Sequence, residues 1–62
     1  MNRILKLKIL EHFKYQADFA QLVKLREERL SRIVNGRVSP TDRERQRIAE
    51  ALGIPEKELF QS

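Results

Sequence analysis

Apolar residues recur along this chain at helical spacing, in short blocks separated by polar turns. In the first block, residues 3–13, a helix would gather three or four apolar residues on one face: Leu5, Ile9, Phe13 and, in a wider stripe, Leu10. The same block alternates apolar residues with lysines, which is the pattern of a half-buried strand. Because no later segment offers a partner strand, we expect a helix here and leave open an extended start over residues 1–7.

Two short helices are predicted next, over residues 17–24 and 27–34. Each has three apolar residues on one face, namely Phe19, Ala20 and Val23 in the first and Leu30, Ile33 and Val34 in the second. The second helix should end at Asn35 and Gly36, because both residue types tolerate positive φ. The turn between the two helices falls at Lys24–Arg26.

A fourth helix should begin at one of two caps. Thr41, with Glu44 three residues on, fits a capping box, and Ser39 with Asp42 fits the same pattern less well. Gly53 should end this helix. Its buried face is predicted to consist of Ile48, Ala49, Ala51 and Leu52.

Pro55 suits the first turn of a fifth, short helix. We expect Leu59 and Phe60, near its end, to lie in the core more than at an interface. The sequence thus predicts an all-α chain with a single domain over residues 1–62. A domain of this size buries one modest core and is marginally stable on its own.

The composition of the chain argues against several classes of function. The chain has 62 residues, no cysteine and one histidine, so disulfides are excluded, and we predict no metal site and no cofactor. We expect His12 to be at the surface or half-buried and find no serine or threonine with an evident base nearby, so we predict that the protein is not an enzyme. No apolar run approaches the ~20 residues of a membrane span, and the N-terminus lacks a signal-peptide pattern. These features predict a cytoplasmic protein, with no membrane partner.

The net charge of +4 is unevenly distributed. Residues 1–15 sum to +3 (four basic, one acidic), residues 16–40 to +2 (five basic, three acidic) and residues 41–62 to −1 (four basic, five acidic). The pair of short helices lies in the positive part, and a basic surface attracts polyanions by releasing their counterions. Alone, this charge is weak evidence for nucleic-acid binding.

The order and spacing of QADFAQLVKLREERLSRIVNGRVSP, followed by RIAEALGIPEKELF, resemble the helix-turn-helix domain of phage repressor and Cro transcription regulators, the XRE-like family. The resemblance covers Gln16 to Phe60 and implies a compact five-helix, lambda-repressor-like fold, with the helix-turn-helix at about residues 16–35. In such a motif the second helix enters the major groove of DNA while the first lies over the backbone.

The resemblance also implies which residues contact DNA, with residues 27–34 as the recognition helix. The positions that would read bases are Arg26, Glu27, Glu28, Arg29 and Arg32. The positions that would contact phosphate are Gln16, Asn35, Gly36 and Arg37, with the loop using backbone amides and a basic side chain. We single out Arg32 and Glu28, because arginine can bind guanine O6 and N7 together and glutamate can accept from cytosine N4.

The chain departs from the family pattern at several positions. Lys24 stands where many members have glycine in the turn, and Arg26 where they have a capping serine or threonine, a loss of ~1 kcal/mol. Ile9 and Val34 match positions where several relatives bury an arginine–glutamate pair, and that exchange can be neutral or stabilising. Arg45 stands where an apolar residue is common, so its stem should pack while its guanidinium stays in water.

The implied partner is double-stranded DNA, bound by a homodimer on a pseudo-palindromic site with half-sites about one helical turn apart. The first and the last helix are both candidates for the dimer surface. A rival interpretation is a protein-interaction module of the same fold, antitoxin-like or an adaptor, that presents Glu27 and Glu28 to a basic protein partner. A surface-active basic helix over residues 3–14 ranks last.

Overall fold

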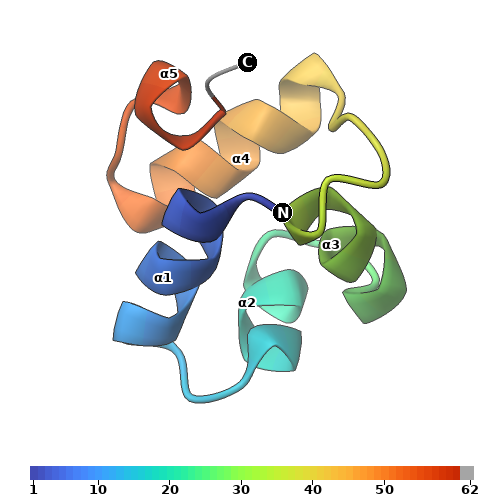
Figure 1. Ribbon diagram of the computed structural model, residues 1–62. Coiled ribbons are helices and arrows are strands. Elements are labelled where there is room, and N and C mark those ends of the chain that lie inside the picture. The colour runs from blue at the N-terminus through green and yellow to red at the C-terminus, as the bar shows by residue number, and fades with distance from the viewer. Residues whose placement is uncertain (61–62) are drawn as a thin grey trace.

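The computed structural model describes residues 1–60, and this part of the chain contains five α-helices and no strand (Figure 1). In chain order they are α1 (Arg3–His12), α2 (Gln16–Leu22), α3 (Glu27–Val34), α4 (Asp42–Leu52) and α5 (Glu56–Leu59). The predicted all-α, five-helix architecture is confirmed, and the first block is a helix. An extended start over residues 1–7 is wrong, because α1 already begins at the third residue.

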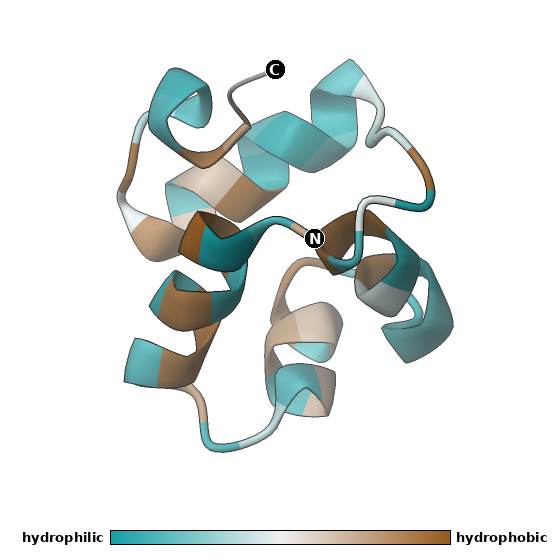
Figure 2. Ribbon diagram, viewed as in Figure 1, coloured by the Kyte–Doolittle hydropathy of each residue, from teal (hydrophilic) through white to brown (hydrophobic). Residues whose placement is uncertain are grey.

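All five helices contribute side chains to one apolar core. Its buried members are Leu5, Ile9, Phe19, Ala20, Val23, Leu30, Ile33, Val34, Ile48, Ala49, Leu52 and Leu59. In Figure 2, hydrophobic stretches of α1 and α3 surround the centre of the fold, whereas most of α4 is hydrophilic. No polar or charged residue of the described part is buried. The predicted apolar faces of α2 and α3 are therefore confirmed in full.

Two residues predicted for the core lie at the surface instead. Leu10 is exposed, because one step along a helix from the buried Ile9 turns a side chain by about a quarter of a circle. Ala51 is exposed next to the buried Leu52 for the same reason. The narrower stripe is the correct one for α1, and Phe13 completes it by packing edge-on against Phe19, with ring centroids 5.2 Å apart.

The predicted caps of α4 are confirmed at Thr41 and Gly53. The Thr41 hydroxyl accepts from the Glu44 backbone N–H at 3.1 Å, and the Glu44 carboxylate accepts from the Thr41 backbone N–H at 2.8 Å. These two bonds make a capping box, so the alternative start at Ser39 is wrong. Gly53 follows α4 with φ +68°, in the left-handed region that glycine adopts easily.

Asn2 ties the start of the chain to two other helices. Its side-chain Oδ1 accepts from the Leu5 backbone N–H at 3.0 Å, which caps α1, while its Nδ2 donates to the Leu59 carbonyl at 2.5 Å. Its backbone N–H donates to the carbonyl of Val34, the last residue of α3, at 2.7 Å. The side chain and the backbone N–H of Asn2 thus join the beginning of α1 to the ends of α5 and α3, respectively.

The Arg45 side chain stays 30% exposed, and its guanidinium also binds groups of the protein, which the sequence did not predict. It donates to the Pro40 carbonyl at 2.9 Å and forms ion pairs with Asp42 and, at 3.5 Å, with Glu56. These contacts hold the start of α4 against the preceding loop and α5. Ile9 and Val34, at the positions of the family's buried ion pair, are both buried in the apolar core.

Candidate nucleic-acid interface

The second and third helices are joined by a short turn (Figure 1). They also pack through a shared apolar face. Lys24 in this turn has φ +60°, a left-handed conformation that is uncommon for residues other than glycine. The turn is closed by hydrogen bonds from the Lys24 N–H to the Gln21 carbonyl at 3.2 Å and from the Leu25 N–H to the Ala20 carbonyl at 2.9 Å. Ala20 is buried at this junction, where its small side chain lets α2 and α3 approach closely.

The third helix turns its charged residues outward. Its buried face consists of Leu30, Ile33 and Val34. Four of the five predicted base-reading residues are exposed, which are Arg26, Glu27, Glu28 and Arg32. Glu28 and Arg32 are four residues apart and therefore lie one above the other on the same face of the helix.

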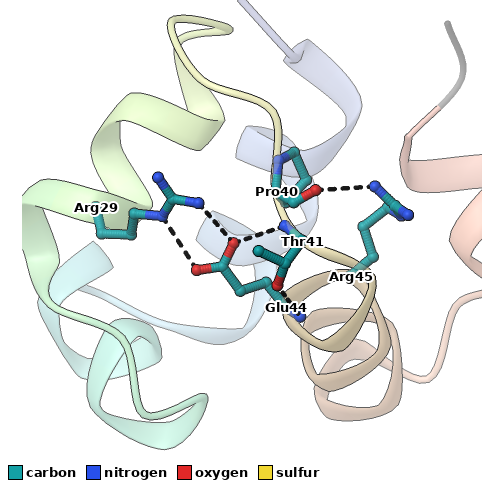
Figure 3. A network of polar contacts seen from close by, with 5 residues as sticks. All are labelled: Arg29, Pro40, Thr41, Glu44 and Arg45. Atoms are coloured by element: carbon teal, nitrogen blue, oxygen red, sulfur yellow. Dashed lines mark hydrogen bonds and ion pairs between the residues drawn. The ribbon is translucent and has the colours of Figure 1, made fainter.

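The fifth predicted base-reading residue, Arg29, is half-buried and bound to α4. Figure 3 shows its guanidinium facing the carboxylate of Glu44, with Nε at 3.0 Å from Oε2 and Nη2 at 2.9 Å from Oε1. This fork-like geometry is the strong form of an arginine–carboxylate contact. Arg29 would have to break this ion pair to reach a base, so its place among the base readers stays a prediction.

The Glu44 carboxylate therefore accepts hydrogen bonds from two partners, the Arg29 guanidinium and the Thr41 backbone N–H, and both stabilise its charged form. The hydrogen bond from Arg29 is the main influence and lowers the pKa of the Glu44 carboxyl below its usual range; burial opposes this shift, and the Thr41 backbone N–H adds to it. The same contact raises the pKa of Arg29. The capping role of Glu44 can be predicted from the sequence, but the ion pair cannot, because nothing in the sequence shows that α3 and α4 meet there.

The loop after α3 places the predicted phosphate-binding residues at the surface. Asn35, Gly36 and Arg37 are exposed, and Gly36 has φ +75°. Their backbone N–H groups already donate within the chain: Asn35 to the Ser31 carbonyl at 2.9 Å, Gly36 to Ile33 at 3.1 Å and Arg37 to Arg32 at 2.9 Å. The side chains of Asn35 and Arg37 are therefore the donors of this loop that we assign to phosphate, and the place of the Gly36 amide among the phosphate contacts stays a prediction.

Gln16, the remaining predicted phosphate contact, is the first residue of α2 and is half-buried. The N-terminal end of a helix carries unpaired N–H groups and a partial positive charge, both of which suit a phosphate.

Among the described residues, none of the helices has the length and apolar character needed to span a membrane.

The comparison with known protein families agrees with this arrangement. A family model described as helix-turn-helix matches residues 7–59, which is most of the chain and includes all of α2, α3 and α4. No match was found among curated proteins or among solved structures. The match, the five helices and the buried α2–α3 junction together show that this chain belongs to the XRE-like helix-turn-helix family of DNA-binding regulators.

Proposed function

We propose that this protein is a small repressor-like or Cro-like transcription regulator that places α3 in the major groove of double-stranded DNA. The observation that carries the proposal is the outward row of Glu28 and Arg32 on α3, opposite the buried face that fixes this helix to α2. Two side chains one turn apart can meet neighbouring base pairs. Arg26 and Glu27, at the start of α3, would contact base edges in the same DNA site.

Phosphate contacts would come from both ends of the motif. Gln16 lies at the start of α2, and the side chains of Asn35 and Arg37 follow the end of α3. Because the loop amides are used within the chain, we assign this contact to the two side chains. Such contacts fix the register of a protein on DNA without selecting a sequence.

A single recognition helix contacts few base pairs, so useful affinity calls for two copies. We propose a homodimer on a pseudo-palindromic site whose half-sites are about 34–36 Å apart, one helical turn of DNA. The protein would act at the nucleoid in the cytoplasm, and regulation would follow from occupancy of a promoter. This placement rests on the family alone.

Selection of binding sites from a random duplex pool tests the proposal. We expect enrichment of a two-fold symmetric sequence, with an affinity that falls steeply as salt is raised. Arg32→Ala should relax the preference at one position of each half-site by about 1–3 kcal/mol, whereas Arg37→Ala should weaken all sequences equally. Lys57→Ala, on the exposed side of α5, removes the same charge away from α2 and α3 and is the matched control.

A second function, binding of a basic protein through α3, is favoured by the exposed carboxylates of Glu27 and Glu28. The two functions differ in the selection experiment. Failure to enrich any sequence, with weak binding that does not depend on Arg32, would refute the DNA-reading proposal. Loss of a protein complex on Glu27→Gln and Glu28→Gln would then support the second.

A further inference from the structure

The first helix carries a row of large apolar side chains that the core does not use. Ile4, Leu7 and Leu10 are 47%, 61% and 51% exposed, on the side of α1 opposite the buried Leu5 and Ile9. We call these three residues the α1 outer stripe. Single exposed leucines are ordinary on protein surfaces, but a continuous row on one helix face is typical of an interaction site.

The charged residues at the two ends of the stripe have opposite sign. Arg3 lies at the start of α1 and Glu11 near its end, and both are exposed. Leu7 is at the centre: Ile4 and Leu10 are each three residues from it, and Arg3 and Glu11 are each four residues from it. By helical periodicity all five lie on the outer half of α1.

This arrangement is complementary to itself when the second helix runs in the opposite direction. In an antiparallel pair with a two-fold axis at Leu7, the two copies of Leu7 meet at the axis, and residues at equal distance on opposite sides reach the same level. Ile4 then lies level with Leu10 of the second copy, and Arg3 lies level with Glu11 of the second copy. A parallel pair would instead place like charges together.

We propose that the α1 outer stripe is the surface through which two copies of this chain associate, as an antiparallel, two-fold pair of α1 helices. The inference deepens the proposed function, on which its role at a two-fold DNA site rests, by choosing the first helix as the dimer surface. A second copy offers Arg3 to Glu11, which an anionic membrane surface would repel. Lys6 and Lys8 beside the stripe would favour the membrane instead, so vesicle binding is measured as the opposing outcome. Glu11 is at present 3.6 Å from Lys8 in an exposed ion pair, which is easily exchanged.

The size of the stripe predicts a weak complex. A helix of ten residues is about 15 Å long, so the area it buries falls below the roughly 1,200 Å² of a stable complex. We expect a dissociation constant in the micromolar range or weaker in the absence of DNA, and a tighter dimer when two half-sites hold both copies.

Sedimentation equilibrium of the full chain, at concentrations up to about 1 mM, measures the association without DNA. Leu7→Glu should make the protein monomeric, because it places two carboxylates at the two-fold axis. Leu22→Glu is the matched control, since Leu22 on α2 is 55% exposed and lies outside the stripe. Thermal unfolding followed by circular dichroism should show both variants folded.

Reversal of the two end charges tests the antiparallel direction. Arg3→Glu and Glu11→Arg should each weaken the dimer, on the order of tenfold for two exposed pairs, and the double variant should recover the wild-type constant. Both reversals suit the helix dipole, so α1 should stay folded. A double variant that is as weak as the singles would overturn the antiparallel pairing.

Two other results would overturn the proposal. One is a wild-type protein that stays monomeric at the highest concentration, whether or not it binds vesicles of phosphatidylglycerol, and the other is equal association of the Leu7→Glu and Leu22→Glu variants. DNA binding is measured separately. The Leu7→Glu variant should bind a single half-site with wild-type affinity. Its affinity should not increase when a second half-site is added to the DNA. If the protein dimerises as expected but selects no DNA sequence, the proposed function fails and the dimer surface stands.

Discussion

The turn between α2 and α3 offers the sharpest test of how this sequence holds its fold. Lys24 is the one residue other than glycine with positive φ in the described part of the chain, at +60°. Its Cβ approaches the following carbonyl in this conformation, which costs an L-residue about 1–2 kcal/mol. Lys24→Gly removes that cost without changing the turn.

The gain is smaller than the strain, because glycine also loses more backbone freedom on folding. That entropic penalty is about 0.5–1 kcal/mol, so the net stabilisation at the middle of the two ranges should be about 0.75 kcal/mol. For a domain of this size the midpoint of thermal unfolding should rise by roughly 2–8 °C. Urea unfolding should show the same gain, with an unchanged slope.

Two variants separate the backbone effect from the loss of a charged side chain. Lys24→Ala removes the charge and keeps Cβ, so it should not stabilise the protein. Gly53→Ala makes the reverse change at φ +68°, where an added Cβ meets no atom within 4 Å, and should destabilise the protein by about 0.5–1 kcal/mol. If Lys24→Gly and Lys24→Ala had equal midpoints, the argument from backbone strain would be refuted.

Two further predictions concern the polar ties between helices. Asn2→Asp keeps the acceptor that caps α1 but loses the donor to the Leu59 carbonyl, so it should cost less than Asn2→Ala, which loses both bonds and about 1–2 kcal/mol. Chemical unfolding ranks the two variants: equal costs would mean that the cap on α1 contributes nothing, and an Asn2→Asp variant as stable as wild type would mean that the Leu59 bond contributes nothing. Glu44 has a lowered pKa in the folded state, mainly through Arg29, so its charge contributes stability above the ordinary glutamate pKa of about 4.3, and this is lost as pH falls through the lowered folded value. Glu44→Gln should therefore be less stable than wild type at pH 7 and lose less stability between pH 5 and pH 3. Urea unfolding at several pH values measures this, and an equal loss of unfolding free energy in both proteins between pH 5 and pH 3 would contradict it.

The sequence predicted those parts of the fold that depend on local rules. Helical periodicity placed the core residues of α2 and α3, because each helix has one buried face. The capping box at Thr41 and the helix end at Gly53 were also predicted correctly, since each is recognised within a few residues of chain. The resemblance of the α2–α3 segment to XRE-like regulators agrees with the family match over residues 7–59.

The remaining features join residues that are distant along the chain. The contact of Asn2 with Leu59 spans 57 residues, and that of Arg29 with Glu44 spans 15. Local periodicity contains no information on such pairs, because they depend on how the helices cross. The partners of the loop amides at Gly36 could not be predicted for a related reason: a residue type indicates a turn, but it does not show which carbonyls the turn will satisfy.

These ties matter for function because they surround the helix that is proposed to read DNA. The strained turn at Lys24 precedes α3, the Glu44 carboxylate holds Arg29 in the first turn of α3, and the Asn2 backbone N–H donates to the carbonyl of Val34, the last residue of α3. Side chains must be placed closely to distinguish bases, so a small rotation of α3 changes selectivity before it changes folding. Substitutions at Glu44 should therefore alter sequence preference although this residue does not touch DNA, whereas Lys57 on α5 lies outside this set and its substitution should not.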